Sequence, residues 1–336
     1  MKALICDEPG RLSIVERPIP VPGDGEVLVR IRRVGICGTD FHIFQGKHPF
    51  LQYPRVMGHE LSGTVESAPA GSGLTHGQNV YIVPYLSCGK CIGCRRGFTN
   101  ACQNIAVLGV HRDGGMAEFL AAPASNVIPA GNASLDDAAM IEFLAIGAHG
   151  VKRGGISAQD RVLVVGSGPI GMSAIIFAKA RGANVTVMDT RENRLAFASD
   201  ALGADHQLMA DADAEAEAKR LTGGDFFDVV IDATGNASAM QRGFGFVAHG
   251  GRYVLVSVVP TEITFSDPEF HKRETTLFAS RNAQPDDFAE VVRQMDAGKV
   301  PTRALNTHRG PLSDGASLFK DWLRPEAGVI KAILEV

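Results

Sequence analysis

The chain contains 336 residues, a length that exceeds one ordinary hydrophobic core and is typical of two domains. Its composition is that of a globular protein, with 45% hydrophobic and 21% charged residues. The 33 basic and 37 acidic residues give a net charge of -4, which provides no general attraction to nucleic acid or anionic lipid.

Hydropathy and the first residues point to a soluble protein. Apolar runs such as 161–165 are broken by glycine or charge long before they could span a bilayer. The residues after Met1 lack the charged and long apolar regions of a signal peptide. We therefore expect a cytoplasmic protein with neither a membrane nor a nucleic acid as partner.

The first half of the chain contains donor side chains suited to zinc. They are Cys37 in GICGTDFH and His59 in MGHELSG, with Glu60 and Glu142 as candidate oxygen ligands. A lone cysteine is usually a small core residue, and a lone histidine is usually just hydrogen bonded. Residue type alone therefore does not decide whether these residues bind zinc.

Four of the six cysteines lie in SCGKCIGCRRGFTNAC, with the spacing C-x2-C-x2-C-x7-C. This spacing lets four sulfurs surround one zinc ion at about 2.3 Å. Two disulfides would need an oxidising compartment, and an iron–sulfur cluster also takes four thiolates. We favour zinc, and four protein ligands leave no open position for a substrate, so this site is structural. Its ligands are Cys88, Cys91, Cys94 and Cys102.

Strand patterns differ between the two halves. Residues 26–32 alternate between apolar and polar side chains, which is typical of a half-buried strand in a β-rich region. From Arg161 onward, short apolar runs alternate with helical stretches, which predicts a parallel sheet with crossover helices. These runs are 161–165, 184–188, 227–231 and 252–256. Residues 328–336 resemble a final strand, whose partner the periodicity does not reveal.

A glycine-rich turn, GSGPIG, follows the first of these strands and opens a helix. Gly166, Gly168 and Gly171 permit a tight turn and close approach of a pyrophosphate, whose charge faces the helix N-terminus at Pro169 and Ile170. Alone, such a hexamer is equally typical of a strand-to-helix connection. Its position between a strand and a helix favours dinucleotide binding.

The next strand ends at Asp189, eighteen residues after Gly171. A carboxylate there accepts hydrogen bonds from the ribose hydroxyls and repels a 2′-phosphate, which favours NAD over NADP. Arg191 and Arg194 could compensate that phosphate, although solvated positions on the next helix are the simpler interpretation.

Taken together, these segments resemble the zinc-dependent medium-chain alcohol dehydrogenases, and within them the branch of sorbitol and threonine dehydrogenases. The matching segments are 35–42, 58–60, the four-cysteine segment, 166–171 and Ser280-Arg281-Asn282. The resemblance covers the whole chain. It implies an α/β protein with a β-rich GroES-like catalytic domain (1–150 and 291–336) and a doubly wound Rossmann domain (151–290). It also implies a homo-oligomer, either a dimer or a tetramer.

The resemblance also implies roles for single residues. Cys37 and His59 correspond to the ligands of the catalytic zinc. Glu142 stands where this branch has an acidic ligand or near-ligand, but Phe143 replaces the usual proline, so Glu60 is an alternative ligand. Thr39 and His42 correspond to the family's proton relay, and the four cysteines correspond to its structural zinc site. We also expect Arg194 and Arg281 to bind the cofactor.

This resemblance implies oxidation of a secondary hydroxyl, with hydride transfer to a nicotinamide. The alternatives are a zinc-dependent dehydrogenase of another alcohol or amino-alcohol, a zinc-free reductase, and a non-enzymatic, cofactor-sensing protein. The two metal sites argue against the zinc-free reductase. The intact set of Cys37, Thr39, His42, His59 and Glu142 argues against the non-enzymatic protein. The segments CGTDFHIFQGKHPF, GVHRDGG and KRETTLFASRNAQPDDF look most like bacterial dehydrogenases acting at C5 of L-galactonate or L-gulonate. Lys47, His48, His111 and Arg112 could bind a carboxylate, although each is also an ordinary loop residue.

Overall fold

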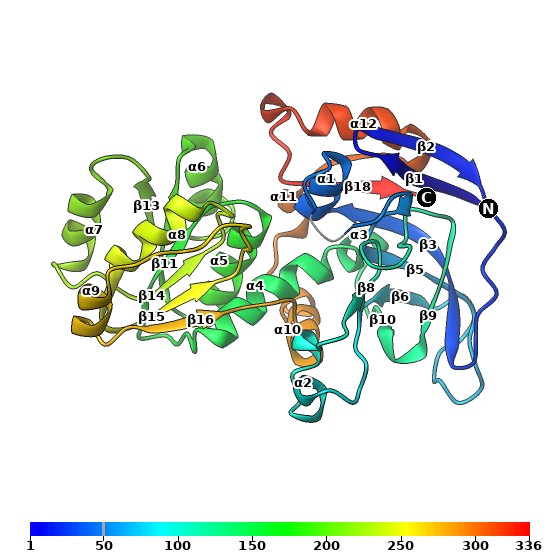
Figure 1. The fold of residues 1–336 in the computed structure, drawn as a ribbon, viewed down its shortest axis with the longest axis horizontal. Coiled ribbons are helices and arrows are strands. Elements are labelled where there is room, and N and C mark those ends of the chain that lie inside the picture. The colour runs from blue at the N-terminus through cyan, green and yellow to red at the C-terminus, as the bar shows by residue number, and fades with distance from the viewer. Residues whose placement is uncertain (49–50) are drawn as a thin grey trace. The chain divides into compact units, whose positions relative to one another are not determined.

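The computed structural model describes residues 1–48 and 51–336. The chain forms two compact units, Met1–Glu142 with Thr302–Val336, and Phe143–Pro301 (Figure 1). The domain boundaries predicted from the sequence, at 150/151 and 290/291, stay a prediction. Helices α4 (Ile141–Arg153) and α10 (Pro285–Asp296) run across both of those junctions.

The first unit is rich in strands and contains a seven-stranded sheet, a three-stranded sheet and a two-stranded ribbon. Its strands are β1 (Lys2–Glu8), β2 (Arg11–Glu16), β3 (Glu26–Ile36), β4 (Arg55–Val56), β5 (Glu60–Ser67), β6 (Asn79–Ile82), β7 (Tyr85–Leu86), β8 (Ala106–Val107), β9 (Phe119–Pro123), β10 (Val127–Pro129), β17 (Asn306–Pro311) and β18 (Lys331–Glu335). Its helices are α1 (Gly38–Phe44), α2 (Ile92–Arg95), α3 (Leu135–Ala138), α11 (Thr302–Leu305) and α12 (Gly315–Trp322).

Strand β3 organises the seven-stranded sheet because it pairs with β5, β9 and β18. Val27, Val29 and Ile31 are buried, as the period-two pattern predicts, and Leu28 is nearly buried as well. The orphan C-terminal strand is β18, which pairs antiparallel with β3 and parallel with β17. The sequence pattern predicted this strand, while its place beside β3 comes from tertiary structure.

The second unit is a six-stranded parallel sheet in the order β13-β12-β11-β14-β15-β16. This order is that of a Rossmann fold, with a topological switch point beside the first strand. The strands are β11 (Arg161–Val165), β12 (Asn184–Asp189), β13 (His206–Met209), β14 (Phe227–Asp232), β15 (Val247–Leu255) and β16 (Thr276–Ala279). The remaining helices of this unit are α5 (Pro169–Ala180), α6 (Glu192–Asp200), α7 (Ala214–Thr222), α8 (Ala237–Gly243) and α9 (Asp267–Lys272).

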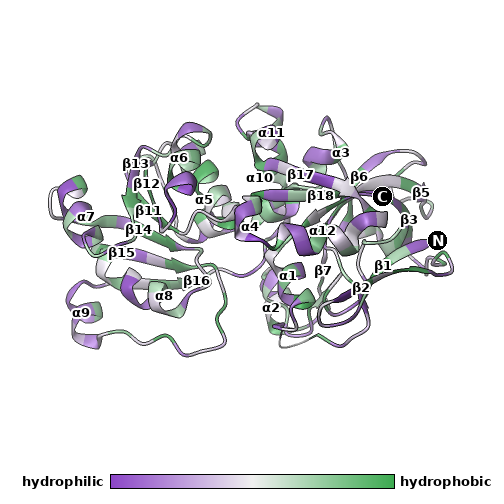
Figure 2. Ribbon diagram, turned by 90° about the horizontal axis from the view of Figure 1, so that it is seen from above, coloured by the Kyte–Doolittle hydropathy of each residue, from purple (hydrophilic) through white to green (hydrophobic). Residues whose placement is uncertain are grey.

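Apolar character explains which strands of the second unit were predictable. Strands β11, β12 and β14 are almost entirely buried, and hydrophobic residues dominate them in Figure 2. The edge strands β13 (HQLM) and β16 (TLFA) expose more of their side chains, and their apolar runs are only two and three residues long. They were not predicted, because an edge strand is buried on fewer sides.

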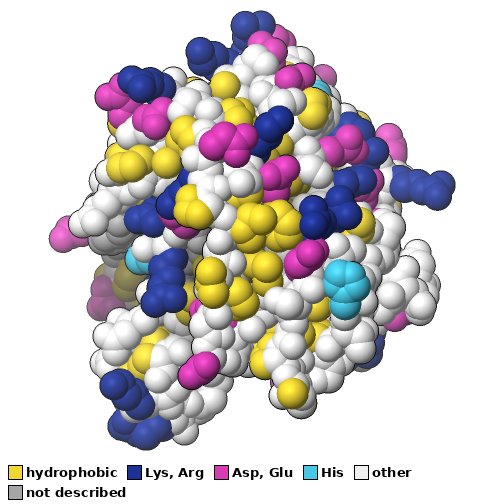
Figure 3. All heavy atoms as spheres, turned by 90° about the vertical axis from the view of Figure 1, so that its right-hand side faces the viewer, with side chains coloured by type: hydrophobic (Ala, Val, Ile, Leu, Met, Phe, Trp, Pro, Cys, Tyr) yellow, Lys and Arg dark blue, Asp and Glu magenta, His cyan; other side chains and the backbone are white. Residues whose placement is uncertain are grey.

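Lys and Arg side chains lie among Asp and Glu side chains on the face shown in Figure 3. Within residues 1–48 and 51–336, every helix falls short of the length and apolarity that a membrane span requires.

Candidate metal and cofactor sites

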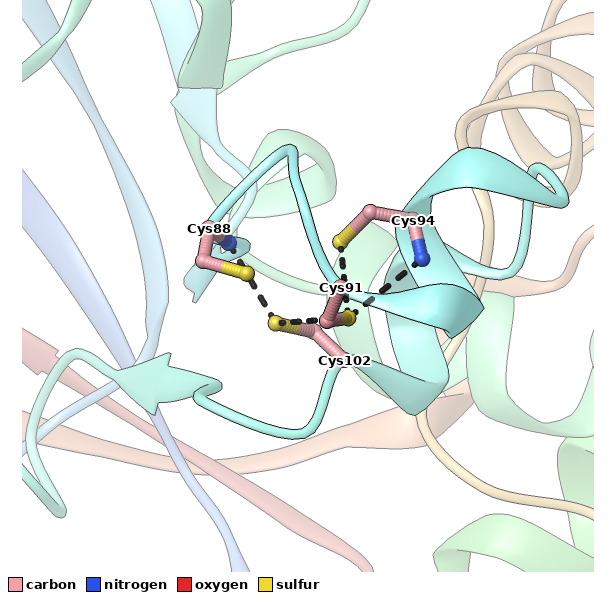
Figure 4. A group of neighbouring side chains, drawn as sticks. All are labelled: Cys88, Cys91, Cys94 and Cys102. Carbon is pink, nitrogen blue, oxygen red and sulfur yellow. Dashed lines mark hydrogen bonds between the residues drawn. The ribbon is translucent and has the colours of Figure 1, made fainter.

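The four cysteines converge between β7 and β8, in a loop that contains the single-turn helix α2 (Figure 4). All four sulfurs lie within 4.8 Å of one another. The Cys91 sulfur is 3.5 Å from that of Cys94 and 3.9 Å from that of Cys102. Four sulfurs held tetrahedrally at ~2.3 Å from one zinc ion would be about 3.8 Å apart, so the separations fit zinc.

Backbone N–H groups are directed at these sulfurs. The amides of Cys94 and Gln103 each donate to the Cys91 sulfur at 3.5 Å. These bonds lower the pKa of Cys91, and the amides of Lys90 and Cys91 lower the pKa of Cys88 to about 6. Thiolates are the form that binds metal, so the backbone is arranged for a metal site.

A second group of ligand atoms lies in the first unit. Cys37 follows β3 and precedes α1, His59 precedes β5, and Glu60 is the first residue of β5. One ligand atom from each lies within 4.8 Å of the others. His59 is 5% exposed and Glu60 is fully buried. A sulfur, a nitrogen and an oxygen donor converging in a buried position fit zinc.

The electrostatic environment of His59 also fits a cation. Burial lowers the pKa of His59, but Asp40 and Cys37 outweigh this effect and raise it well above its ordinary value. Within the described residues, Nδ1 of His59 is a buried nitrogen without a hydrogen-bond partner. The negative groups that favour a proton on this ring equally favour a metal ion beside it.

Asp40 supports this group, and the sequence analysis missed it. Its fully buried carboxylate accepts hydrogen bonds from the amides of Cys37 (2.9 Å) and Gly58 (3.3 Å), and lies 3.9 Å from Nδ1 of His59. Burial raises its pKa, against the effect of His59. The available signal was an acidic residue at the third position of a helix that begins after Cys37.

Lys331 is a second missed residue. Its ammonium group lies 2.5 Å from the Glu60 carboxylate and 3.1 Å from the Ile36 carbonyl oxygen, and it is 1% exposed. Glycine at position 35 permits this arrangement, because a Cβ there would lie 2.3 Å from a Glu60 oxygen. A sequence separation of 271 residues left no local signal for the pair.

Glu142 lies beside this group but outside it. It sits in the first turn of α4, is 5% exposed, and accepts a hydrogen bond from the hydroxyl of Tyr85. Burial raises its pKa, against the opposing effect of His59. In the described part of the chain, the ligand atoms that converge are those of Cys37, His59 and Glu60.

The two residues of the expected proton relay lie on α1, directly after Cys37. Thr39 is half-buried in the first turn, and His42 is exposed in the last turn. Their spacing of three residues places both side chains on one face of the helix. The helix therefore connects the metal-ligand segment with the solvent.

The second unit has a cavity of about 680 Å³ at the carboxyl ends of its strands. The glycine-rich turn contributes Gly166 and Gly168 to its wall, and β12 contributes Asp189. Gly166 has a φ of +90°. A Cβ on Gly171 would lie 1.7 Å from the Gly166 carbonyl oxygen, so both glycines are required by the turn.

Charges of both signs line this cavity. Asp189 accepts hydrogen bonds from the amides of Ser167 (2.7 Å) and Arg191 (3.0 Å), which fixes the carboxylate at the end of β12. The acidic residues Asp211 and Glu215 line the same cavity. Its basic residues are Arg191 and Arg242.

The remaining predicted cofactor residues lie elsewhere in the second unit. Pro169 and Ile170 form the first turn of α5, with Gly168 as its N-cap. Arg194 is 7% exposed on α6, and burial lowers its pKa. Arg281 is exposed after β16. Among the described residues, neither arginine lines the 680 Å³ cavity.

Two family models match the chain. The model described as "Alcohol dehydrogenase GroES-like domain" matches residues 23–132. The model described as "Zinc-binding dehydrogenase" matches residues 169–297. The first covers Cys37, His59 and the four cysteines, and the second covers most of the Rossmann sheet.

Individual relatives agree with these models. The chain is 43% identical to an L-galactonate-5-dehydrogenase of Escherichia coli K12, over 99% of this chain and 98% of that protein. An alcohol dehydrogenase of E. coli CFT073, solved with NADH, superposes with a TM-score of 0.94 at 31% identity over 100% and 99% of the two chains. A dehydrogenase of Sinorhizobium meliloti 1021, described as zinc-binding and solved with NADP, has a TM-score of 0.92 at 27% identity, over 100% and 99%.

The likeness extends over both units and includes the residues of both candidate metal sites. The expected family and fold class are confirmed. The chain belongs to the zinc-dependent medium-chain alcohol dehydrogenase family and is a zinc-containing dehydrogenase of the polyol or sugar-acid type.

Proposed function

We propose that the protein oxidises a secondary hydroxyl of a sugar acid or polyol, with NAD as hydride acceptor and L-galactonate as the first candidate substrate. The observation that carries this proposal is the 43% identity, over 99% of the chain, to the L-galactonate-5-dehydrogenase. The convergence of Cys37, His59 and Glu60 supplies the chemistry that such a reaction needs.

Two zinc ions per chain follow from the two ligand groups. The four cysteines would hold one ion that has no part in the reaction. Cys37, His59 and Glu60 would hold the other, with Glu142 beside them, and that zinc supplies a Lewis acid that lowers the pKa of a substrate hydroxyl toward neutrality. Asp40 orients this group by fixing the amides of Cys37 and Gly58.

Thr39 and His42 provide the path for the hydroxyl proton. The Oγ1 atom of Thr39, half-buried beside Cys37, accepts the proton and passes its own onward. His42, exposed on the same face of α1, releases the proton to water. The cavity lined by Gly166, Gly168 and Asp189 would hold NAD, which would supply the acceptor for the hydride on the carbon that carries this hydroxyl.

The cofactor cavity favours NAD. Asp189, Asp211 and Glu215 place three carboxylates on its wall, and a 2′-phosphate would bring further negative charge to them. Arg191 lies against Asp189, with its Nε atom 3.4 Å from the carboxylate, so part of its charge is already matched.

The experiment is a comparison of kcat/KM on zinc-loaded enzyme with L-galactonate, polyols and simple primary alcohols, each with NAD and NADP. We expect L-galactonate with NAD to be the best pair. Faster turnover of ethanol-like substrates would overturn the substrate class, and equal efficiency with NADP would overturn the cofactor preference. Absence of turnover with every alcohol would favour the cofactor-sensing alternative.

We also propose that identical chains associate. Strand β16 is the last strand in the order of its sheet and leaves Thr276 and Leu277 exposed, with Leu277 at 39%. An exposed edge strand presents unpaired backbone groups to another strand. Light scattering should therefore give twice or four times the chain mass of 35.6 kDa, and the single-chain mass would contradict the proposal.

A further inference from the structure

Asp232 is a buried acid that the proposed reaction does not use. It is the last residue of β14, lies beside Val165 of β11 in the parallel register, and is fully buried. Burial raises its pKa, against the effect of its hydrogen bonds with Thr234. Burying a carboxyl group inside a sheet costs free energy unless its oxygens are bonded, so the bonds that it forms are informative.

A single oxygen of Asp232 makes the hydrogen bonds of this side chain. Oδ1 accepts the amide of Thr234 at 2.9 Å and the hydroxyl of Thr234 at 2.8 Å. Within residues 1–48 and 51–336, Oδ2 is a buried oxygen without a hydrogen-bond partner. Asp232 therefore acts on Thr234 through one acceptor atom, which holds both its backbone and its side chain in place.

Thr234 extends this hydrogen-bonded chain into the next turn. Its Oγ1 atom, which donates to Asp232, also accepts the amide of Asn236 at 3.1 Å. The side-chain oxygen of Asn236 accepts the Ala239 amide at 3.0 Å and so caps α8. Thr234, Asn236 and Ala239 all line the 680 Å³ cavity. Asp232 lies behind that wall, because among the described residues it is fully buried and does not line the cavity.

The methyl group of Thr234 packs against the glycine-rich turn. A Cβ added at Gly166 would lie 3.1 Å from Cγ2 of Thr234 and 3.2 Å from the Ala233 carbonyl oxygen. These atoms therefore occupy the space into which a side chain at Gly166 would extend. Gly166 lines the same cavity and belongs to the turn that a pyrophosphate would approach. The side chain that Asp232 orients thus supports the backbone of the cofactor site.

We propose that Asp232 is a positioning residue of the dinucleotide site, which fixes Thr234 and through it the wall of the cavity at the end of β14. In a Rossmann sheet the two halves of the dinucleotide bind on either side of the switch point, which here lies between β11 and β14. Asp189 at the end of β12 belongs to the adenosine side, so Asp232 serves the nicotinamide side. This inference rests on the proposed function, in which the cavity holds NAD.

The test measures the Kd of NAD and the Kd of AMP, which contains only the adenosine half, by calorimetry on zinc-loaded enzyme. Asp232→Asn keeps an accepting oxygen and Asp232→Ala removes it. Thr234→Val keeps a methyl group and removes the hydroxyl, so it tests the same contact without altering the buried acid. Asp228→Ala is the matched control, because Asp228 lies near the other end of β14, where it accepts the Arg161 amide at 2.7 Å.

We expect Asp232→Ala and Thr234→Val each to raise the Kd of NAD by about 10-fold, the scale of one or two lost hydrogen bonds, with little change for AMP. Asp232→Asn should stay within about threefold of wild type, because its amide oxygen can accept both bonds from Thr234. Asp228→Ala should bind NAD as the wild type does.

Three outcomes would overturn the assignment. An unchanged Kd of NAD in Thr234→Val would separate the hydroxyl from cofactor binding. Equal losses for NAD and AMP would show a general disturbance of the second unit, and a loss in Asp232→Asn as large as in Asp232→Ala would show that the accepting oxygen is not what matters. If the wild-type enzyme itself binds no NAD, the proposed function fails, and this inference with it.

Discussion

Lys331 and Glu60 form a buried pair in which each charge depends on the other. Both side chains are at most 1% exposed, and the ammonium also donates to the Ile36 carbonyl oxygen. A charge in such a position is stabilised only while its partner remains. The pair therefore also determines how much negative charge Glu60 presents to a metal.

The Lys331→Met substitution should destabilise the protein by about 3–5 kcal/mol, because it leaves the Glu60 carboxylate buried without its partner. Denaturant unfolding of wild type and variant without an ion at Cys37 and His59 measures this loss, because a bound ion would itself be a partner for Glu60. The double variant Glu60→Gln/Lys331→Met should recover much of it, since neither charge is then buried. Unaltered stability in Lys331→Met would contradict the pairing.

For Thr39, we expect Thr39→Ala to slow turnover by about 10²-fold or more, the scale for lost general acid–base help. Zinc content and NAD binding should be unchanged, because Thr39 is a ligand of neither. Cys37→Ala is the informative comparison: it should abolish turnover together with one zinc ion. Wild-type turnover in Thr39→Ala would exclude the hydroxyl from the proton path.

The four-cysteine loop is an element that metal binding holds together. The loop contains the four-residue helix α2. The hydrophobic side chains of Ile92 and Phe98 in this loop are 43% and 47% exposed. With so little apolar burial, the loop depends on its metal for structure.

The Cys94→Ser substitution should consequently affect stability more than chemistry. We expect a loss of about 4 kcal/mol or more, the range for removal of a structural metal. The folded fraction should keep its kcat for the proposed substrate, because the proposed reaction site is at Cys37 and His59. A well-folded variant that retains this zinc and loses turnover would refute the structural role.

Helix α10 begins with a buried acid whose contribution depends on pH. Burial alone would raise the pKa of Asp287, but hydrogen bonds with His149 (2.7 Å) and the Gln284 amide (2.8 Å) lower it below its ordinary value. A lowered folded pKa gives stability that is present above the unfolded pKa of about 3.9 and is lost as pH falls through the folded pKa.

We therefore expect Asp287→Asn to lose about 1 kcal/mol at pH 7, and the difference from wild type to vanish in acid below the folded pKa. Urea unfolding at several pH values measures this. The neighbouring Asp286→Asn is the matched control, because the side chain of Asp286 is 91% exposed. A difference that persists undiminished in acid would assign the effect to packing.

The sequence predicted those elements whose pattern is local. The buried runs of β11, β12 and β14, the glycine-rich turn and the four-cysteine loop each carry their signal within a few residues. Cys37, His59 and Glu60 were predicted by donor type, and the fold brought them together. Asp40 and Lys331 were missed because both act through other residues, and Lys331 does so from a distant strand.

At the scale of the whole molecule, the candidate metal sites and the cofactor cavity lie in different units. The first contains both candidate metal sites, and the second contains the cofactor cavity. Each unit has its own sheet and its own buried core. We therefore expect loss of metal from the first unit to leave the dinucleotide site intact.

Elemental analysis should give two zinc ions per chain. Cys37→Ala should keep one zinc and still bind NAD, as measured by NAD fluorescence titration or calorimetry, because the ligands of the remaining ion are the four cysteines. A single zinc in the wild-type protein, or loss of NAD binding in a well-folded Cys37→Ala, would contradict this division.

The position of β18 affects the order in which the two units of the nascent chain can fold. Lys331 leaves the ribosome 271 residues after Glu60, a delay of roughly 14 to 54 s at ~5–20 residues per second. All six strands of the Rossmann sheet are translated in that interval, from one uninterrupted stretch. The second unit can thus fold first. The first unit can complete its sheet only after β18 has been synthesised, and until then Glu60 lacks its counter-ion. Synthesis proceeds from the N-terminus, but completion of the metal-site unit comes last.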